Sequence, residues 1–165
     1  MNFIKKIKTT AGAFGLAVVL TGSLVGTVMT PAMAHETKCP YCKLAVTQDT
    51  KEQDNEVLLR VGNKRIEYRC VMCAFAQSKT KFKGDLTILA PTNVKGKKVT
   101  ITRKGGQWSA DPSTVVFVYQ KGNHKECEEL YRAVADEKTA AAYAKNKGFK
   151  DAKFLTLAQM IEASK

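Results

Sequence analysis

Histidine is scarce in this sequence, which has only His35 and His124 among its 165 residues. Histidine is the commonest general base in enzymes, so few residues of this sequence could serve as a catalytic histidine. The sequence also has no GxSxG nucleophile motif and no phosphate-binding loop, and its 15 acidic residues are scattered over expected loops and helix surfaces. We therefore expect a protein that is not an enzyme.

Long apolar runs are missing after residue 34, and no later stretch approaches the roughly 18 apolar residues that span a bilayer. Before that point, three lysines precede an apolar region and an Ala-x-Ala cleavage site at residues 32–34. The pattern predicts a signal peptide over residues 1–34 and a mature domain over residues 35–165, periplasmic or secreted and without a transmembrane span. The cleavage point carries no cysteine, so the chain lacks a lipobox.

Acidic residues are outnumbered, and the formal charge of the chain is +12. The predicted signal peptide carries three lysines and no acid, which leaves +9 for residues 35–165. These cations are spread along the sequence with few interleaved aromatic residues, which is typical of solvated basic faces. We expect no nucleic-acid partner.

Cysteine, by contrast, occurs at informative spacing. The two CxxC pairs Cys39-Pro40-Tyr41-Cys42 and Cys70-Val71-Met72-Cys73 flank residues 43–69, which read as a hairpin. Each pair offers two thiolates on one turn, and a hairpin would fold one turn onto the other, as in a metal-binding knuckle. Four thiolates suit Zn, whereas Cu(I) accepts two or three sulfur ligands. The candidate metal ligands are Cys39, Cys42, Cys70 and Cys73, with Met72 as an accessory thioether that would favour Cu(I).

Other interpretations of these cysteines stay open. In an oxidising compartment they could form structural disulfides, or take part in thiol–disulfide exchange. Cys-Pro-Tyr-Cys is also a glutaredoxin dithiol sequence, but we predict no strand before it, which disfavours a redox catalyst. Met72 could simply fill the core. Covalent haem is disfavoured because Lys43 and Ala74 follow the pairs where histidine would be required.

Three further residues could take part in metal or exchange chemistry. All five cysteines follow residue 34, and an odd number leaves at least one unpaired, metal-bound or bonded to another molecule. His124 and Cys127 form an HxxC pair that could add ligands. His35 would be the mature N-terminus, where its amine and imidazole could chelate Cu(II) together.

The remaining sequence predicts an α+β fold of antiparallel sheets with short packed helices. Strands are expected over residues 56–61, 64–69, 86–90, 98–103, 107–110, 115–119 and 154–157. Helices are expected over 71–79, over 126–134 as a short helix or turn, from an Asp136 cap to Gly148, and after a Thr156/Gln159 capping box. The expected core holds Leu86, Ile88, Val99, Ile101, Trp108, Val116 and Val118.

The second cysteine pair should stand at the first turn of the helix over residues 71–79. There the helix dipole lowers the pKa of a thiol and favours the thiolate that metals need. Arg65 and Arg69 act in the same direction.

A CxxC pair, a hairpin that ends in an aromatic residue, and a cysteine turn that leads into a helix with Phe75 together resemble the TRASH and YHS metal-binding motifs. More specifically, the chain is similar to the NosL family of exported copper proteins. The likeness continues through residues 98–110, with Trp108 before Asp111, then 115–119, the helix over 140–148 and Phe154-Leu155-Thr156-Leu157.

This resemblance implies an α+β fold of two related sheet-and-helix halves, residues 35–84 and 85–165. It also implies Cu(I) binding without catalysis, as a chaperone or sequestering protein, with a client metalloprotein or membrane transporter as partner. The sequence departs from the family at Leu44, where methionine is common, and by having Cys70 and Cys73 around Met72. Those departures move the site towards Zn or a tighter Cu(I) trap. The alternatives are a structural Zn or disulfide knuckle in a partner-binding module, or a thiol–disulfide exchange protein.

Overall fold

The computed structural model describes residues 37–46, 56–121 and 129–164, which belong to one compact unit, Met33–Lys165. The predicted signal peptide, His35, the HxxC pair and most of the polar stretch after the first cysteine turn lie outside the described residues. Within the described part of the chain, no helix is long and apolar enough to cross a membrane.

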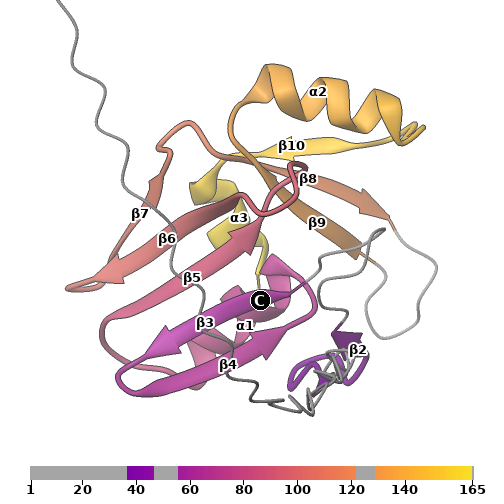
Figure 1. The fold of residues 1–165 in the computed structure, drawn as a ribbon. Coiled ribbons are helices and arrows are strands. Elements are labelled where there is room, and N and C mark those ends of the chain that lie inside the picture. Colours follow the sequence, from indigo (N-terminus) through magenta and orange to yellow (C-terminus); the bar gives the residue numbers. More distant parts are fainter. Residues whose placement is uncertain (1–36, 47–55, 122–128, 165) are drawn as a thin grey trace, which may run out of the picture. The chain divides into compact units, whose positions relative to one another are not determined.

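Over these ranges the chain is α+β, with three antiparallel sheets and three short helices, and the predicted fold class is confirmed (Figure 1). In chain order the elements are β1 (Thr37–Lys38), β2 (Ala45–Val46), β3 (Val57–Val61), β4 (Lys64–Tyr68), α1 (Val71–Thr80), β5 (Leu86–Pro91), β6 (Lys98–Lys104), β7 (Gln107–Asp111), β8 (Val116–Lys121), β9 (Glu129–Val134), α2 (Glu137–Asn146), β10 (Lys153–Leu155) and α3 (Leu157–Ala163).

The largest sheet has the strand order β4-β3-β5-β6-β7, and every neighbouring pair is antiparallel. Alternation along the strands gives it one apolar face, because Leu59, Ile88 and Ile101 are paired across neighbouring strands and are fully buried. The next residue along β3, Arg60, pairs with Thr87 on the opposite, outer face. The sheet therefore combines β3 and β4, from the expected half over residues 35–84, with β5, β6 and β7, from the expected half over residues 85–165.

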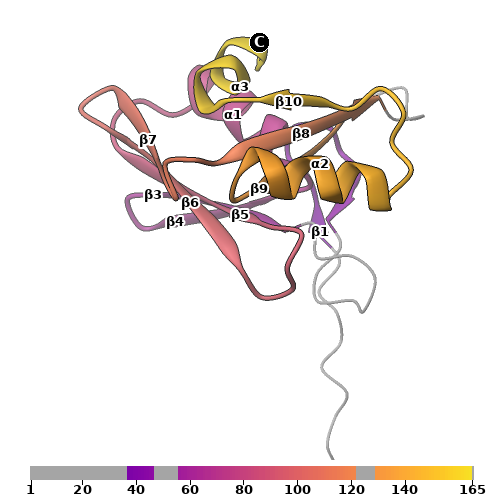
Figure 2. The ribbon, with the colours of Figure 1, turned by 90° about the horizontal axis from the view of Figure 1, so that it is seen from above.

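A second sheet, with the order β10-β8-β9, is covered on both faces. Phe117 and Ala133 belong to the main core, whereas Val118 and Val134 belong to a smaller cluster with Ala140 of α2. Figures 1 and 2 show α2 lying along this sheet. The predicted core is thus divided: Leu86, Ile88, Val99 and Ile101 lie in the main core, Trp108 packs against it partly buried, and Val116 and Val118 lie in the smaller cluster.

The prediction of a short helix or turn over residues 126–134 is wrong for the part that the structure describes. Residues Glu129–Val134 form β9, paired in register with β8 from Val116↔Val134 to Lys121↔Glu129. Ala133 and Val134 are both fully buried, one on each face of the sheet. A strand buried on both faces lacks polar alternation, so local sequence cannot distinguish it from a short helix.

The predicted helix starts are confirmed. Asp136 precedes α2 and its carboxylate accepts the backbone N–H of Thr139 at 2.7 Å, while Gly148 follows the helix with a φ of 69°. Thr156 and Gln159 form the capping box of α3. The predicted strands from residue 56 to residue 119 and the edge strand before α3 are also present, with small shifts at their ends.

Candidate metal centre

The first cysteine pair lies on a tight turn between two very short strands. β1 and β2 are antiparallel, and the turn between them is closed by backbone hydrogen bonds from Cys39 N to Leu44 O (2.8 Å) and from Lys43 N to Cys39 O (2.9 Å). Lys43 adopts a left-handed φ of 65°, which reverses the chain directly after Cys42. Both cysteine side chains of the turn are buried.

This turn corrects one expectation. We predicted no strand before the first pair, but β1 precedes it, with only Thr37 and Lys38. After the pair the chain enters β2 rather than a helix. The strand-then-helix framework of a glutaredoxin dithiol is therefore absent at this turn, and the turn has the form of a metal-binding knuckle.

The second pair lies at the start of α1, as predicted. Cys70 is the residue before the first helical turn, with extended backbone angles (φ −147°, ψ 167°), and Cys73 is the third residue of the helix. The side chain of Cys70 makes no capping hydrogen bond to the helix. At this position the partial positive charge of the helix N-terminus faces the thiols and favours their ionised form.

Three of the four cysteines form a compact cluster. The Sγ atoms of Cys39, Cys42 and Cys73 all lie within 4.8 Å of one another, and all three side chains are buried. Cys70 stands outside this group, but its Sγ lies 3.3 Å from Cys73 Sγ. None of these four cysteines is disulfide-bonded. Converging thiolates of this kind could hold a soft or borderline metal ion.

Met72, the predicted accessory ligand, has a different environment. Its side chain is partly buried and packs against the main hydrophobic core. The contact observed for the Met72 thioether is thus one with the core, which is the alternative to a metal bond that the sequence left open.

The electrostatics of the cluster favour a thiolate at Cys39, whose pKa is lowered from 9.0 to about 5. The largest cause is hydrogen bonding with the Cys73 side chain. Burial acts in the opposite direction, and the backbone N–H groups of Arg69, Cys42 and Tyr41 add further stabilisation of the thiolate. The site is therefore prepared to bind a cation through sulfur without first having to remove a proton from Cys39 at neutral pH.

A buried hydrogen-bond relay joins the two cysteine turns. The Tyr68 hydroxyl donates to Gln77 Oε1 at 2.9 Å, and Gln77 Nε2 donates to the backbone carbonyl of Pro40 at 3.3 Å. Burial raises the pKa of Tyr68 to about 12, with the charges of Cys39 and Cys73 acting in the same direction, so its hydroxyl remains a donor. Gln77 thus connects α1 to the turn that carries the first pair.

Sequence analysis did not single out Gln77. It lies four residues after Cys73 on α1, and this spacing places two side chains on the same face of a helix. A glutamine in line with Cys73, directly after the apolar first half of the helix, was the signal that could have identified it. Its partner Tyr68 was expected only as part of the hairpin.

The far end of α1 is also anchored. The Arg103 guanidinium donates to the backbone carbonyls of Ser78 (2.9 Å), Phe82 (2.6 Å) and Gly84 (2.9 Å). In the middle of the helix, the Phe75 ring packs against Trp108 with ring centroids 5.0 Å apart. These contacts fix the helix that presents Cys73.

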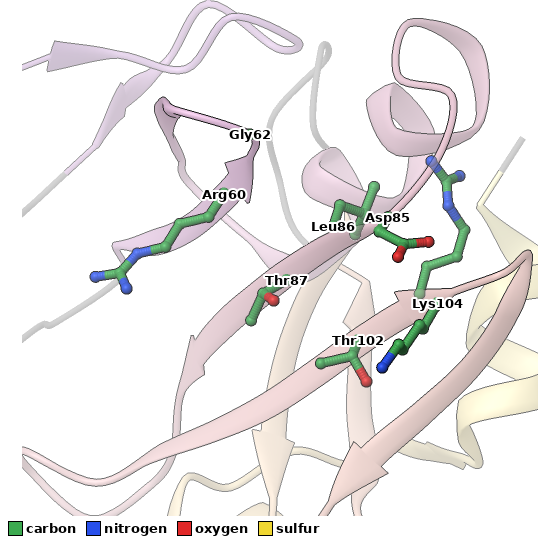
Figure 3. A pocket seen from close by; sticks show the side chains of 8 residues that line it. Arg60, Gly62, Asp85, Leu86, Thr87, Thr102 and Lys104 are labelled. Atoms are coloured by element: carbon green, nitrogen blue, oxygen red, sulfur yellow. The ribbon is translucent and has the colours of Figure 1, made fainter.

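A hollow of about 260 Å³ lies elsewhere, on the outer face of the five-stranded sheet (Figure 3). Arg60, Thr87 and Thr102 line it from three neighbouring strands. Two of its polar groups are already bonded: Asp85 accepts the N–H of Gly105 at 2.8 Å, and Thr102 shares a hydrogen bond with the Ser109 hydroxyl. The hollow has no cysteine or histidine in its lining, so it is distinct from the thiol cluster.

Comparison with known proteins gives a likeness of fold. No protein-family model matches the chain, and no curated protein matches it. Among solved structures it is similar to the mercury-bound form of MerB2, with a TM-score of 0.55 and 10% sequence identity. The similarity covers 79% of this chain and 66% of that one, so the chain spans slightly less than two thirds of that structure. At this level of identity the likeness shows a shared fold.

Proposed function

We propose that this protein binds Cu(I) through the thiolates of Cys39, Cys42 and Cys73 and carries or sequesters it. The observation that supports the proposal is the cluster of three buried sulfur atoms within 4.8 Å of one another. Cu(I) is a soft ion that is well satisfied by two or three thiolates. A lowered pKa at Cys39 supplies one of the negative charges before the ion arrives.

The number of converging thiols favours copper over structural zinc. Structural zinc sites are closed tetrahedra with four protein ligands, whereas three sulfurs complete a trigonal site for Cu(I). The solved structure with a similar fold is described as mercury-bound, and mercury is another soft, thiol-seeking metal. Its low identity makes this a minor support for the proposal.

A NosL-like role in an exported compartment forms part of the same proposal. It is supported by the signal-peptide pattern over residues 1–34 and by the sequence features that resemble that family. In this role the protein hands its metal to a client metalloprotein or a membrane transporter and catalyses no reaction. Burial of the thiols would protect the bound ion from water and oxidants during transfer.

A structural zinc knuckle is the second candidate, and one distance favours it. Cys70 Sγ lies only 3.3 Å from Cys73 Sγ, so a fourth thiol adjoins the cluster. The same closeness would also suit a disulfide or thiol–disulfide exchange at this pair. Insulin reduction assays test the thiol–disulfide exchange activity. Catalytic reduction of insulin by this protein would favour an exchange function over metal transport.

Anaerobic titration of the reduced protein with Cu(I), in competition with bathocuproine disulfonate, tests the main proposal. We expect one tightly bound ion per chain and a thiolate-to-copper charge-transfer band in the ultraviolet. The variants Cys39→Ser, Cys42→Ser and Cys73→Ser should each lose the band, whereas Val94→Ala, at an exposed surface position, should keep it. Cu(I) binding at the wild-type level in each of the three cysteine variants would refute the copper assignment. Stoichiometric zinc that Cu(I) cannot displace from the wild-type protein would also refute it.

A further inference from the structure

Cys70 occupies a position where cysteine is a poor structural choice. It is the N-cap of α1, a place where Ser, Thr, Asp or Asn normally accepts a backbone N–H of the first turn. The Cys70 side chain makes no such bond, although its backbone has the extended conformation of an N-cap. The thiol therefore does not cap the helix, and its Sγ lies beside Cys73 of the neighbouring site.

The geometry places this thiol beside the cluster but not within it. Its Sγ is 3.3 Å from Cys73 Sγ, whereas Cys39, Cys42 and Cys73 form the group in which every pair lies within 4.8 Å. Sulfur atoms that share a tetrahedral zinc, with Zn–S bonds of about 2.3 Å, lie about 3.8 Å apart. At 3.3 Å, Cys70 Sγ is slightly closer to Cys73 Sγ than two sulfurs on one zinc would be, so a small outward shift would bring the pair to the ligand-to-ligand distance.

Its backbone position allows the thiol to approach the others. An N-cap residue has extended backbone angles and lies outside the helical turns, so its χ1 angle is not subject to the rotamer restriction of helical residues. A change in χ1 would displace Cys70 Sγ within its buried surroundings, where the residue is 6% exposed, while the backbone of α1 stays in place. The three-thiol and four-thiol arrangements would then differ mainly in this one side chain.

We propose that Cys70 is the specificity-determining residue of the site: it stays out of a three-thiolate Cu(I) complex and becomes the fourth ligand of a tetrahedral Zn(II) complex. This inference rests on the proposed Cu(I) function. Zn(II) requires the fourth thiolate to close its tetrahedron, whereas Cu(I) is already satisfied by three. The residue therefore sets how strongly zinc competes with copper for the same cluster.

The test compares wild type with Cys70→Ser, titrated separately with Cu(I) and Zn(II) under anaerobic, reducing conditions. Serine is a favoured N-cap, so the variant should keep α1, and circular dichroism of the metal-free protein checks its fold. We expect an unchanged Cu(I) affinity and a loss of Zn(II) affinity of about 100-fold or more, because even second-shell losses cost roughly 10–100-fold. Cys73→Ser is the matched control and should lose both metals.

X-ray absorption gives an independent readout. Zinc in the wild type should have four sulfur neighbours, and zinc in Cys70→Ser should have three sulfurs and one lighter atom, while copper should have three sulfurs in both proteins. Equal losses of both metals, or no loss of either, would overturn the role of Cys70. Failure of the wild type to bind Cu(I) would instead refute the proposed function, and the specificity inference with it.

Discussion

The surroundings of Cys39 favour an ionised thiol. Its pKa is lowered to about 5 by hydrogen bonding with Cys73 and by backbone N–H groups, even though burial alone would raise it. The CxxC spacing identified this residue as a candidate ligand from the sequence. The sequence could not show that its thiol is ionised, because that requires knowing which backbone and side-chain groups donate hydrogen bonds to it.

The lowered pKa predicts a thiolate in the metal-free, reduced protein well below neutral pH. Absorbance at 240 nm should show a titration step with a midpoint near pH 5. Cys39→Ser should remove the step, and Cys73→Ala should move it to higher pH because the strongest stabilising hydrogen bond is gone. A first thiolate step above pH 7 in the wild type would contradict the described geometry.

The same shift has a consequence for stability. A pKa of about 5 in the folded protein, against 9.0 for an ordinary cysteine, means that the Cys39 contribution is fully present above pH 9 and is lost as pH falls towards 5. Urea unfolding of the metal-free protein should therefore show a free energy of unfolding that rises more steeply between these values in wild type than in Cys39→Ser.

Among the elements, α1 is the one that assembles the site. Its start at residue 71 was predicted from the apolar spacing of residues 71–79, and the structure agrees. The link from this helix to the first cysteine turn was not predicted, because Gln77 and Pro40 are 37 residues apart and no local pattern connects them. β9 was mispredicted for a related reason: its strand conformation depends on pairing with β8.

The Gln77 relay predicts an effect on metal binding without loss of a ligand. Gln77→Met keeps the length of the side chain but removes both polar groups, so Tyr68 loses its acceptor, whereas the Pro40 carbonyl loses one of two donors and keeps its hydrogen bond from Lys43 Nζ. We expect Cu(I) affinity to fall about 10-fold or more, as for other second-shell changes. Stability should fall by about 1–3 kcal/mol, the cost of one unsatisfied buried group.

Competition titration and urea unfolding measure the two effects of Gln77→Met. Gln107→Ala is the control, because that glutamine is exposed at the start of β7. Affinity in Gln77→Met equal to that of wild type would show that the relay does not position the thiols.

At the scale of the whole molecule, the thiol cluster joins two segments that are remote in sequence. Cys39 and Cys42 come from the turn between β1 and β2, and Cys73 comes from α1, which packs in the main core. β1 and β2 are only two residues long each, so their own ladder holds the turn weakly. A metal bound by the cluster would cross-link this turn to the body of the fold.

Metal binding should therefore stabilise the protein measurably. At a free-ion concentration of about 1,000 times Kd, binding adds about 4 kcal/mol, which corresponds to a rise in Tm on the order of 10 °C. Hydrogen exchange should show its largest metal-dependent protection in residues 37–46. A Cys39→Ser/Cys42→Ser double variant should show neither change, and an equal rise in Tm in that variant would place the metal elsewhere.

The sequence by itself determined the α+β class, the positions of most strands and helices, and the cysteines that are candidates for metal chemistry. These follow from local information: alternation, capping residues and CxxC spacing act within a few residues of one another. Only the tertiary structure decided that Cys39, Cys42 and Cys73 converge while Cys70 stands beside them, and that Gln77 connects the two turns. Such distances depend on how α1 packs against the first turn, and that packing is set by the whole core.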